Sequence, residues 1–262
     1  MKTANTPLRA VIFDVDGTLA DTEPEGHRVA FNRAFEEFNL GWYWSVQDYG
    51  ELLATTGGKE RIRRFIDSGA PLPALVDRIG LDTAIARLHA LKSEIYAAMV
   101  LAGRIPLRPG VLRLIRELRE SGIRLAVATT TTPSSLASLI RANFGGDMTK
   151  LFDVIGAGDI VPHKKPAPDI YQWVLRRLEL PPENCIAIED SRPGLAAARG
   201  AGLKTVVTVS AYTAGDSFPD ALAVVSDLGE PDRPLRPIAG TPATGPCIDR
   251  AQLERWHRGE TP

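Results

Sequence analysis

Asp14 and Asp16 stand two residues apart, between a short apolar run at residues 9–13 and Gly17. Such a run is typical of a buried strand. A turn at glycine allows neighbouring carboxylates beyond the strand end to point in different directions. One carboxylate can then act as a nucleophile while the other moves a proton. The pair therefore indicates covalent and acid–base chemistry at one place.

Three more polar clusters follow predicted strands or the loops beside them. Four threonines at residues 129–132 precede Pro133, which is favoured at the first position of a helix. Hydroxyls and free amides at a helix start can bind a phosphate. The other two clusters are a loop with two lysines followed by proline and an acidic pair before a second helix: Lys164, Lys165 and Pro166, then Glu189, Asp190 and Ser191.

Carboxylates at two strand ends, with a lysine and a hydroxyl between them, suit a hard divalent cation. Oxygen ligands favour Mg²⁺. The cation and the lysine would neutralise phosphoryl oxygens, so that an anionic nucleophile can approach. Each cluster alone also fits an ordinary helix cap or a solvated loop. Their combination at one predicted sheet edge indicates phosphoryl transfer.

The order of the predicted elements explains how these clusters meet. Strands are expected at residues 9–13, 124–128, 154–155, 185–188 and 204–209, with helices at 110–120, 133–142, 168–178 and 192–200. This alternation predicts an α/β fold with a doubly wound parallel sheet, whose strand ends form the ligand site. Residues 24–104 have helical periodicity only. We therefore expect a catalytic core at 1–22 and 106–230, a helical cap domain at 23–105 and a flexible C-terminal tail at 231–262.

The composition narrows the range of partners. The 262 residues include 31 basic and 32 acidic side chains, which gives a net charge of −1. This balance disfavours general binding to nucleic acid or to an anionic membrane. Two cysteines are too few for a disulfide scaffold, and no segment has the apolar length of a membrane span. We expect a cytoplasmic monomer whose partner is a small-molecule substrate.

The four clusters resemble the motifs of the haloacid dehalogenase superfamily. This resemblance runs over residues 9–227 and implies a Rossmann-like core with a cap inserted after the first strand. It implies Asp14 as nucleophile and metal ligand, and Asp16 as general acid/base with its backbone carbonyl on the metal. By the same resemblance, Thr129 would hold the phosphoryl group, Lys165 would stabilise nucleophile and phosphate, and Asp190 would complete a Mg²⁺ site. Glu189 would lie in the outer shell.

Residues 55–62, 107–110, 152–159 and 164–171 are similar to the CbbY branch of this superfamily. Members of that branch hydrolyse xylulose 1,5-bisphosphate, an inhibitor of Rubisco, to xylulose 5-phosphate. The resemblance implies the same substrate here, and contacts of Glu23 and His27 with substrate hydroxyls or in proton transfer. The chain has one residue more between these two than the commonest family version.

A bisphosphate would require a second anion site in the cap. Gly58 opens a predicted helix whose first turn carries Lys59 and Arg61, so backbone amides and cations can converge on one phosphate. His89 and Lys92 lie three residues apart on one helix face and could join them. Thr130 and Thr131 would contact substrate beside Thr129.

Three alternatives stay open at this level. A phosphomutase similar to β-phosphoglucomutase shares the motifs and the cap type, and another small sugar phosphate could be the substrate. A catalytically silent sugar-phosphate sensor would keep the fold without the reaction. Release of inorganic phosphate, with no isomer formed, separates these possibilities.

Overall fold

One sheet forms the centre of the computed structural model, which describes residues 6–71, 76, 79–146 and 148–260. Within these residues, seven strands lie in the order β3-β2-β1-β4-β5-β6-β7. Neighbours from β3 to β6 are parallel, and β7 is antiparallel to β6. The strands are β1 Ala10–Phe13, β2 Arg124–Ala128, β3 Val154–Gly156, β4 Cys185–Glu189, β5 Lys204–Thr208, β6 Ala223–Val225 and β7 Pro237–Gly240. The predicted α/β fold is confirmed.

Alternate residues of each strand feed two cores on opposite faces of the sheet. Val11 and Phe13 pack with the apolar faces of α6 (Val111–Glu120), α7 (Pro133–Phe144) and α11 (Arg250–Arg258). Ala10 and Ile12 pack with α9 (Asp169–Leu178) and α10 (Arg192–Gly200). The central strands are covered on both faces, so their sequences are continuous apolar runs. Polar residues therefore lie mainly where these strands end. The short helices α8 (Met148–Leu151) and η2 (Pro182–Asn184) lie in connections.

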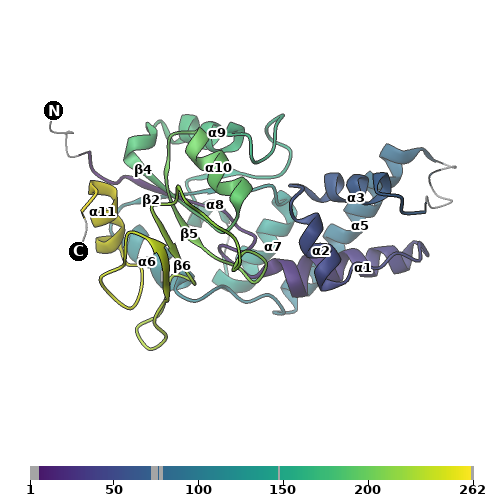
Figure 1. Cartoon of the computed structure of the whole chain (residues 1–262), viewed down its shortest axis with the longest axis horizontal. Coiled ribbons are helices and arrows are strands. Elements are labelled where there is room, and N and C mark those ends of the chain that lie inside the picture. The colour runs from purple at the N-terminus through teal and green to yellow at the C-terminus, as the bar shows by residue number, and fades with distance from the viewer. Residues whose placement is uncertain (1–5, 72–75, 77–78, 147, 261–262) are drawn as a thin grey trace.

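A helical cap follows β1 and extends from the core at the end opposite α11 (Figure 1). It contains η1 (Glu23–His27), α1 (Arg28–Glu37), α2 (Val46–Leu52), α3 (Gly58–Asp67) and α5 (Leu81–Leu101). Its own core is largely aromatic and includes Phe31, Phe35, Trp44 and Tyr49. Tyr212 of the other domain packs against this cluster, so the two domains share an apolar contact. None of the helices in the described residues has the length and apolar character that crossing a membrane requires.

The expectation of a flexible tail at residues 231–262 is wrong for the part that the structure describes. Strand β7 pairs with β6 and covers the edge of the sheet, and Leu253 and Trp256 of α11 are fully buried in the core. Asp249 caps α11 by accepting a hydrogen bond from the Gln252 amide. A composition rich in proline and glycine hid these two short elements, because β7 is exposed and held by its pairing with β6, and α11 is held by the burial of its apolar face.

Candidate active site

Asp14 lies directly after β1 and is held by Lys165. The Lys165 ammonium is 2.6 Å from Asp14 Oδ1 and 2.5 Å from Glu189 Oε1, and it also donates to the Ala128 carbonyl at 2.8 Å. Burial opposes the charge of Lys165, but the two carboxylates raise its pKa above the usual range. The lysine therefore stays charged and fixes the orientation of Asp14.

Glu189 ends β4 and connects Lys165 to the rest of the core. Its side chain is fully buried, and Oε1 also accepts a hydrogen bond from the Tyr171 hydroxyl at 2.6 Å. Gly194 leaves the space that this carboxylate occupies, because a side chain at that position would overlap with it. Glu189 thus acts as an anchor for Lys165.

Three buried carboxylates form a group that could hold a metal ion. One oxygen from each of Asp14, Glu189 and Asp190 lies within 4.8 Å of the others. Burial, and to a lesser degree repulsion among the carboxylates, raises the pKa of Asp14 and Asp190 well above their usual range. A hard divalent cation would offset this accumulation of negative charge, so the residues present fit a Mg²⁺ ion. Gly17, with φ +84°, makes room for Asp190, since a Cβ there would overlap with its carboxylate.

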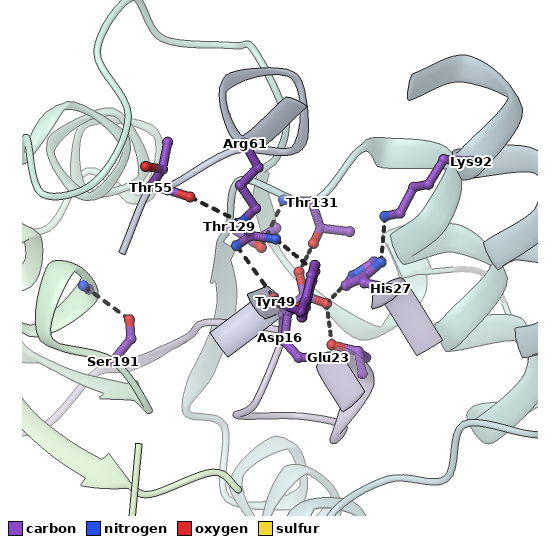
Figure 2. Close-up of polar contacts among 12 residues, drawn as sticks. Asp16, Glu23, His27, Tyr49, Thr55, Arg61, Lys92, Thr129, Thr131 and Ser191 are labelled. Carbon is purple, nitrogen blue, oxygen red and sulfur yellow. Dashed lines mark hydrogen bonds and ion pairs between the residues drawn. The ribbon is translucent and has the colours of Figure 1, made fainter. Parts of the chain in front are cut away.

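Asp16 is not part of that acidic group and lies in a separate set of hydrogen bonds with His27, Thr131 and Thr22, the first two of which Figure 2 labels. Its carboxylate accepts from the Thr22 hydroxyl at 2.6 Å, from the Thr131 hydroxyl and from His27 Nε2 at 2.8 Å. Burial alone would raise the pKa of Asp16, but His27 and the two hydroxyls lower it well below the usual range. The expected contact between its backbone carbonyl and the metal stays a prediction.

His27 connects Asp16 to Lys92 in the cap. The Lys92 ammonium is 2.6 Å from His27 Nδ1, and the imidazole stacks on Tyr96 with ring centroids 4.0 Å apart. Because an ammonium can only donate, Nδ1 is the acceptor and Nε2 carries the proton toward Asp16. Burial lowers the pKa of Lys92 to about 8. The three residues form a polar chain from α5 of the cap to the end of β1.

A cavity of about 490 Å³ opens above these residues, between the core and the cap. On the cap side, Glu23 accepts a hydrogen bond from the Tyr49 hydroxyl at 2.5 Å, and that hydroxyl accepts from Arg61 at 2.9 Å. Arg61 also lies 3.5 Å from Glu23, which forms an ion pair. Figure 2 shows this triad of Glu23, Tyr49 and Arg61 beside Asp16.

Most of the predicted site residues line the cavity: Asp14, Asp16, Glu23, His27, Gly58, Arg61, His89, Lys92, Thr130, Thr131, Lys165 and Asp190. Two do not. Thr129 is buried, and its hydroxyl accepts a hydrogen bond from the Thr131 amide. Lys59 points to the core surface, where its ammonium is 2.5 Å from Asp159. Burial lowers the pKa of His89 to about 3, so this residue is neutral near pH 7.

Sequence reasoning missed three residues that organise the site. Tyr49 and Tyr171 orient Glu23 and Glu189, but a tyrosine at helical spacing gives no signal beyond that of a core residue. Arg108 donates to the carbonyls of Gly17, Val209 and other loop residues, and so ties the turn after β1 to the end of β5. Residues 107–110 contributed to the resemblance to the CbbY branch, but nothing in their sequence indicated the hydrogen bonds that Arg108 makes.

A family model for haloacid dehalogenase-like hydrolases matches residues 8–202. Together with the fold and the geometry of the site, this match places the chain in that family. It is a hydrolase of the phosphatase type.

Within the family, the chain belongs to the CbbY branch. It is 46% identical to the protein CbbY of Cereibacter sphaeroides over 243 residues, which are 91% of this chain and 99% of that protein. A crystal structure of CbbY from Rhodobacter sphaeroides in complex with phosphate matches with a TM-score of 0.77 and 47% identity, covering 84% of this chain and 94% of that one. A variant of the same protein, in complex with xylulose 1,5-bisphosphate, matches with a TM-score of 0.77 and 46% identity over the same shares.

Proposed function

We propose that this protein is a Mg²⁺-dependent sugar-phosphate phosphatase that hydrolyses xylulose 1,5-bisphosphate to xylulose 5-phosphate through an aspartyl-phosphate. The observation that carries the proposal is Asp14, buried at the base of the cavity, held by Lys165 at 2.6 Å and flanked by Glu189 and Asp190. The substrate is suggested by the related CbbY protein whose structure contains that bisphosphate. A cytoplasmic monomer that supports Rubisco by removing an inhibitor is part of the same proposal.

Asp14, Asp190 and the backbone carbonyl of Asp16 would hold Mg²⁺, which would supply charge neutralisation for the phosphoryl oxygens. Glu189 would lie behind these ligands, because its carboxylate accepts from Lys165 and Tyr171. Lys165 adds a fixed positive charge at the same place. An oxygen of the Asp14 carboxylate forms a bond to phosphorus as the bond from phosphorus to the sugar oxygen breaks. Asp16 is ionised before the reaction because its pKa is held low, so the proton for the departing oxygen comes through it: Lys92 gives a proton to His27 Nδ1, His27 Nε2 gives one to Asp16, and Asp16 passes it to the departing oxygen.

In the second half of the reaction, a water molecule attacks the phosphorus of the aspartyl-phosphate. Asp16 removes a proton from this water, and the bond from phosphorus to Asp14 breaks to give inorganic phosphate. Thr131, which donates to Asp16, keeps the carboxylate aimed at the reacting atoms in both steps. Asp16 can serve both half-reactions because it gives up a proton in the first and takes one from water in the second.

The second phosphate of the substrate would bind on the cap side. Arg61 and the start of α3 at Gly58 both line the cavity there. His89 also lines the cavity and would offer a hydrogen bond without charge, since burial lowers its pKa to about 3. Lys59 is not included in this subsite, because it lies outside the cavity wall and pairs with Asp159.

A phosphate-release assay over sugar mono- and bisphosphates, with and without Mg²⁺, tests the proposal. We expect Mg²⁺-dependent release of one phosphate and a preference for pentulose bisphosphates. Formation of a phosphorylated isomer without phosphate release would favour a phosphomutase, and preference for hexose 1-phosphates would reject the proposed substrate.

Replacement of the nucleophile tests the chemistry directly. Asp14→Asn should remove turnover and leave the fold intact, whereas Asp232→Asn at an exposed position should keep normal rates. Mass spectrometry should detect a phosphorylated Asp14 in the wild-type protein during turnover. A normal rate in Asp14→Asn would reject the mechanism.

A further inference from the structure

Four charged residues of alternating sign join the cap to the core beside the active site. Lys59 Nζ is 2.5 Å from Asp159 Oδ2, Lys164 Nζ is 3.1 Å from Asp159 Oδ1, and Lys164 Nζ is 2.7 Å from Glu60 Oε1. Lys59 and Glu60 belong to the first turn of α3 in the cap, and Asp159 and Lys164 belong to the loop after β3 in the core. We name this group the cap–core latch.

The latch connects two segments that carry active-site residues. Lys164 directly precedes Lys165, which holds Asp14. On the cap side, Gly58 and Arg61 flank Lys59 and Glu60 and line the cavity, whereas none of the four latch residues does. The latch therefore fixes the distance between the Arg61 side of the cavity and the Asp14 side without touching the space that a substrate would fill.

The local structure favours this contact. Gly57 has φ +103°, and a Cβ there would overlap with Glu60 and come within 2.8 Å of Lys164 Nζ, so glycine allows Glu60 to reach across. The Lys164 side chain is only 16% exposed, which reduces screening of its two ion pairs by solvent. Its partner Asp159 has a pKa of about 2, held low mainly by the hydrogen bond from Lys59, so the charges persist through the neutral range.

We propose that Lys59, Glu60, Asp159 and Lys164 are positioning residues that hold the cap closed over the cavity during turnover. Two of the three ion pairs, Lys59 with Asp159 and Lys164 with Glu60, join the cap to the core and form only when the two meet, whereas the pair of Lys164 with Asp159 lies within the core loop. A closed cap excludes water and brings Arg61 over the nucleophile. The inference depends on the phosphatase class of the protein and is independent of which sugar phosphate it hydrolyses.

The test is a double-mutant cycle on Lys59 and Asp159, made in the full chain. We expect Asp159→Asn and Lys59→Met each to raise KM for the preferred sugar phosphate by roughly 3- to 10-fold with a smaller change in kcat, since partly exposed ion pairs are individually weak. The KM of the double variant should be no higher than the KM of the more impaired single variant, because both substitutions remove the same ion pair. A KM increase in the double variant equal to the product of the two single increases would overturn the proposal.

A matched control uses another ion pair of similar exposure that stays within the core. Arg199 and Asp220 form an ion pair whose side chains are 48% and 50% exposed, so Asp220→Asn should leave KM unchanged.

Hydrogen exchange gives a readout that needs no turnover: the amides of α3 and of residues 157–165 should exchange faster in Asp159→Asn and not in Asp220→Asn. Unchanged exchange in Asp159→Asn would overturn the proposal. A protein without sugar-phosphate turnover but with this exchange pattern would reject the proposed function and leave the latch in place.

Discussion

Replacement of Lys92 by methionine should stabilise the protein near pH 7 while impairing catalysis. Lys92 lies in the middle of α5, and its side chain is 5% exposed. Its ammonium contacts His27 Nδ1 and lies 4.8 Å and 5.2 Å from the ring centroids of Phe31 and Tyr96. These contacts do not replace the lost hydration, and burial lowers the pKa of Lys92 from 10.5 to about 8.

The size of this effect follows from the linkage between protonation and folding. A pKa that is lower in the folded state by this amount corresponds to about 3 kcal/mol of unfavourable free energy at pH 7. Methionine removes that cost, fills a similar volume and loses one hydrogen bond to His27, which contributes about 1 kcal/mol. We therefore expect a gain of about 2 kcal/mol in the free energy of unfolding.

The pH dependence gives the sharper test. Between pH 8 and 10.5 the unfolded chain binds the Lys92 proton and the folded protein does not, so the wild-type protein gains stability as pH rises through this interval. The advantage of Lys92→Met should therefore be full below pH 8 and should disappear toward pH 10.5. Urea unfolding at pH 7, 8, 9 and 10 measures it, with Lys150→Met at an exposed position as control. A variant less stable than wild type at pH 7, or a difference that does not change with pH, would refute this reasoning.

Three further substitutions test separate parts of the structure. Gly17→Ala should lower kcat at least 100-fold in a phosphate-release assay, because the new methyl group would displace the Asp190 carboxylate and the backbone has φ +84°; unchanged kcat would contradict the assigned role of Asp190. Tyr171→Phe should destabilise the protein by about 2 kcal/mol in urea unfolding, since a buried hydrogen bond to the charged Glu189 is lost; a neutral effect would mean that Lys165 alone satisfies Glu189. Trp256→Ala should cost about 3–5 kcal/mol by thermal or urea unfolding, because the ring is fully buried in the core; a loss below 1 kcal/mol would show that α11 is dispensable.

The sequence alone determined which residues meet at the edge of the sheet. Asp14, Asp190 and the segment after β2 follow buried apolar runs, and parallel strands bring such ends together whatever the details of packing. Local patterns also predicted that residues 24–104 form helices, since this segment has helical periodicity without a strand signal. These predictions depend on period and order along the chain, which are properties of the sequence itself.

Only the tertiary structure decided how the cap side chains are used. His27 and Lys92 are 65 residues apart, and Lys59 and Asp159 are 100 apart, so neither contact has a local signature. Long side chains such as Lys59 and Arg61 can reach several partners from the same helix turn. Their direction is set by charges on elements that fold against them, and for this reason Lys59 joins the core surface while Arg61 turns into the cavity. The same reason explains α11, whose nine residues are stable through the burial of Leu253 and Trp256 against the sheet.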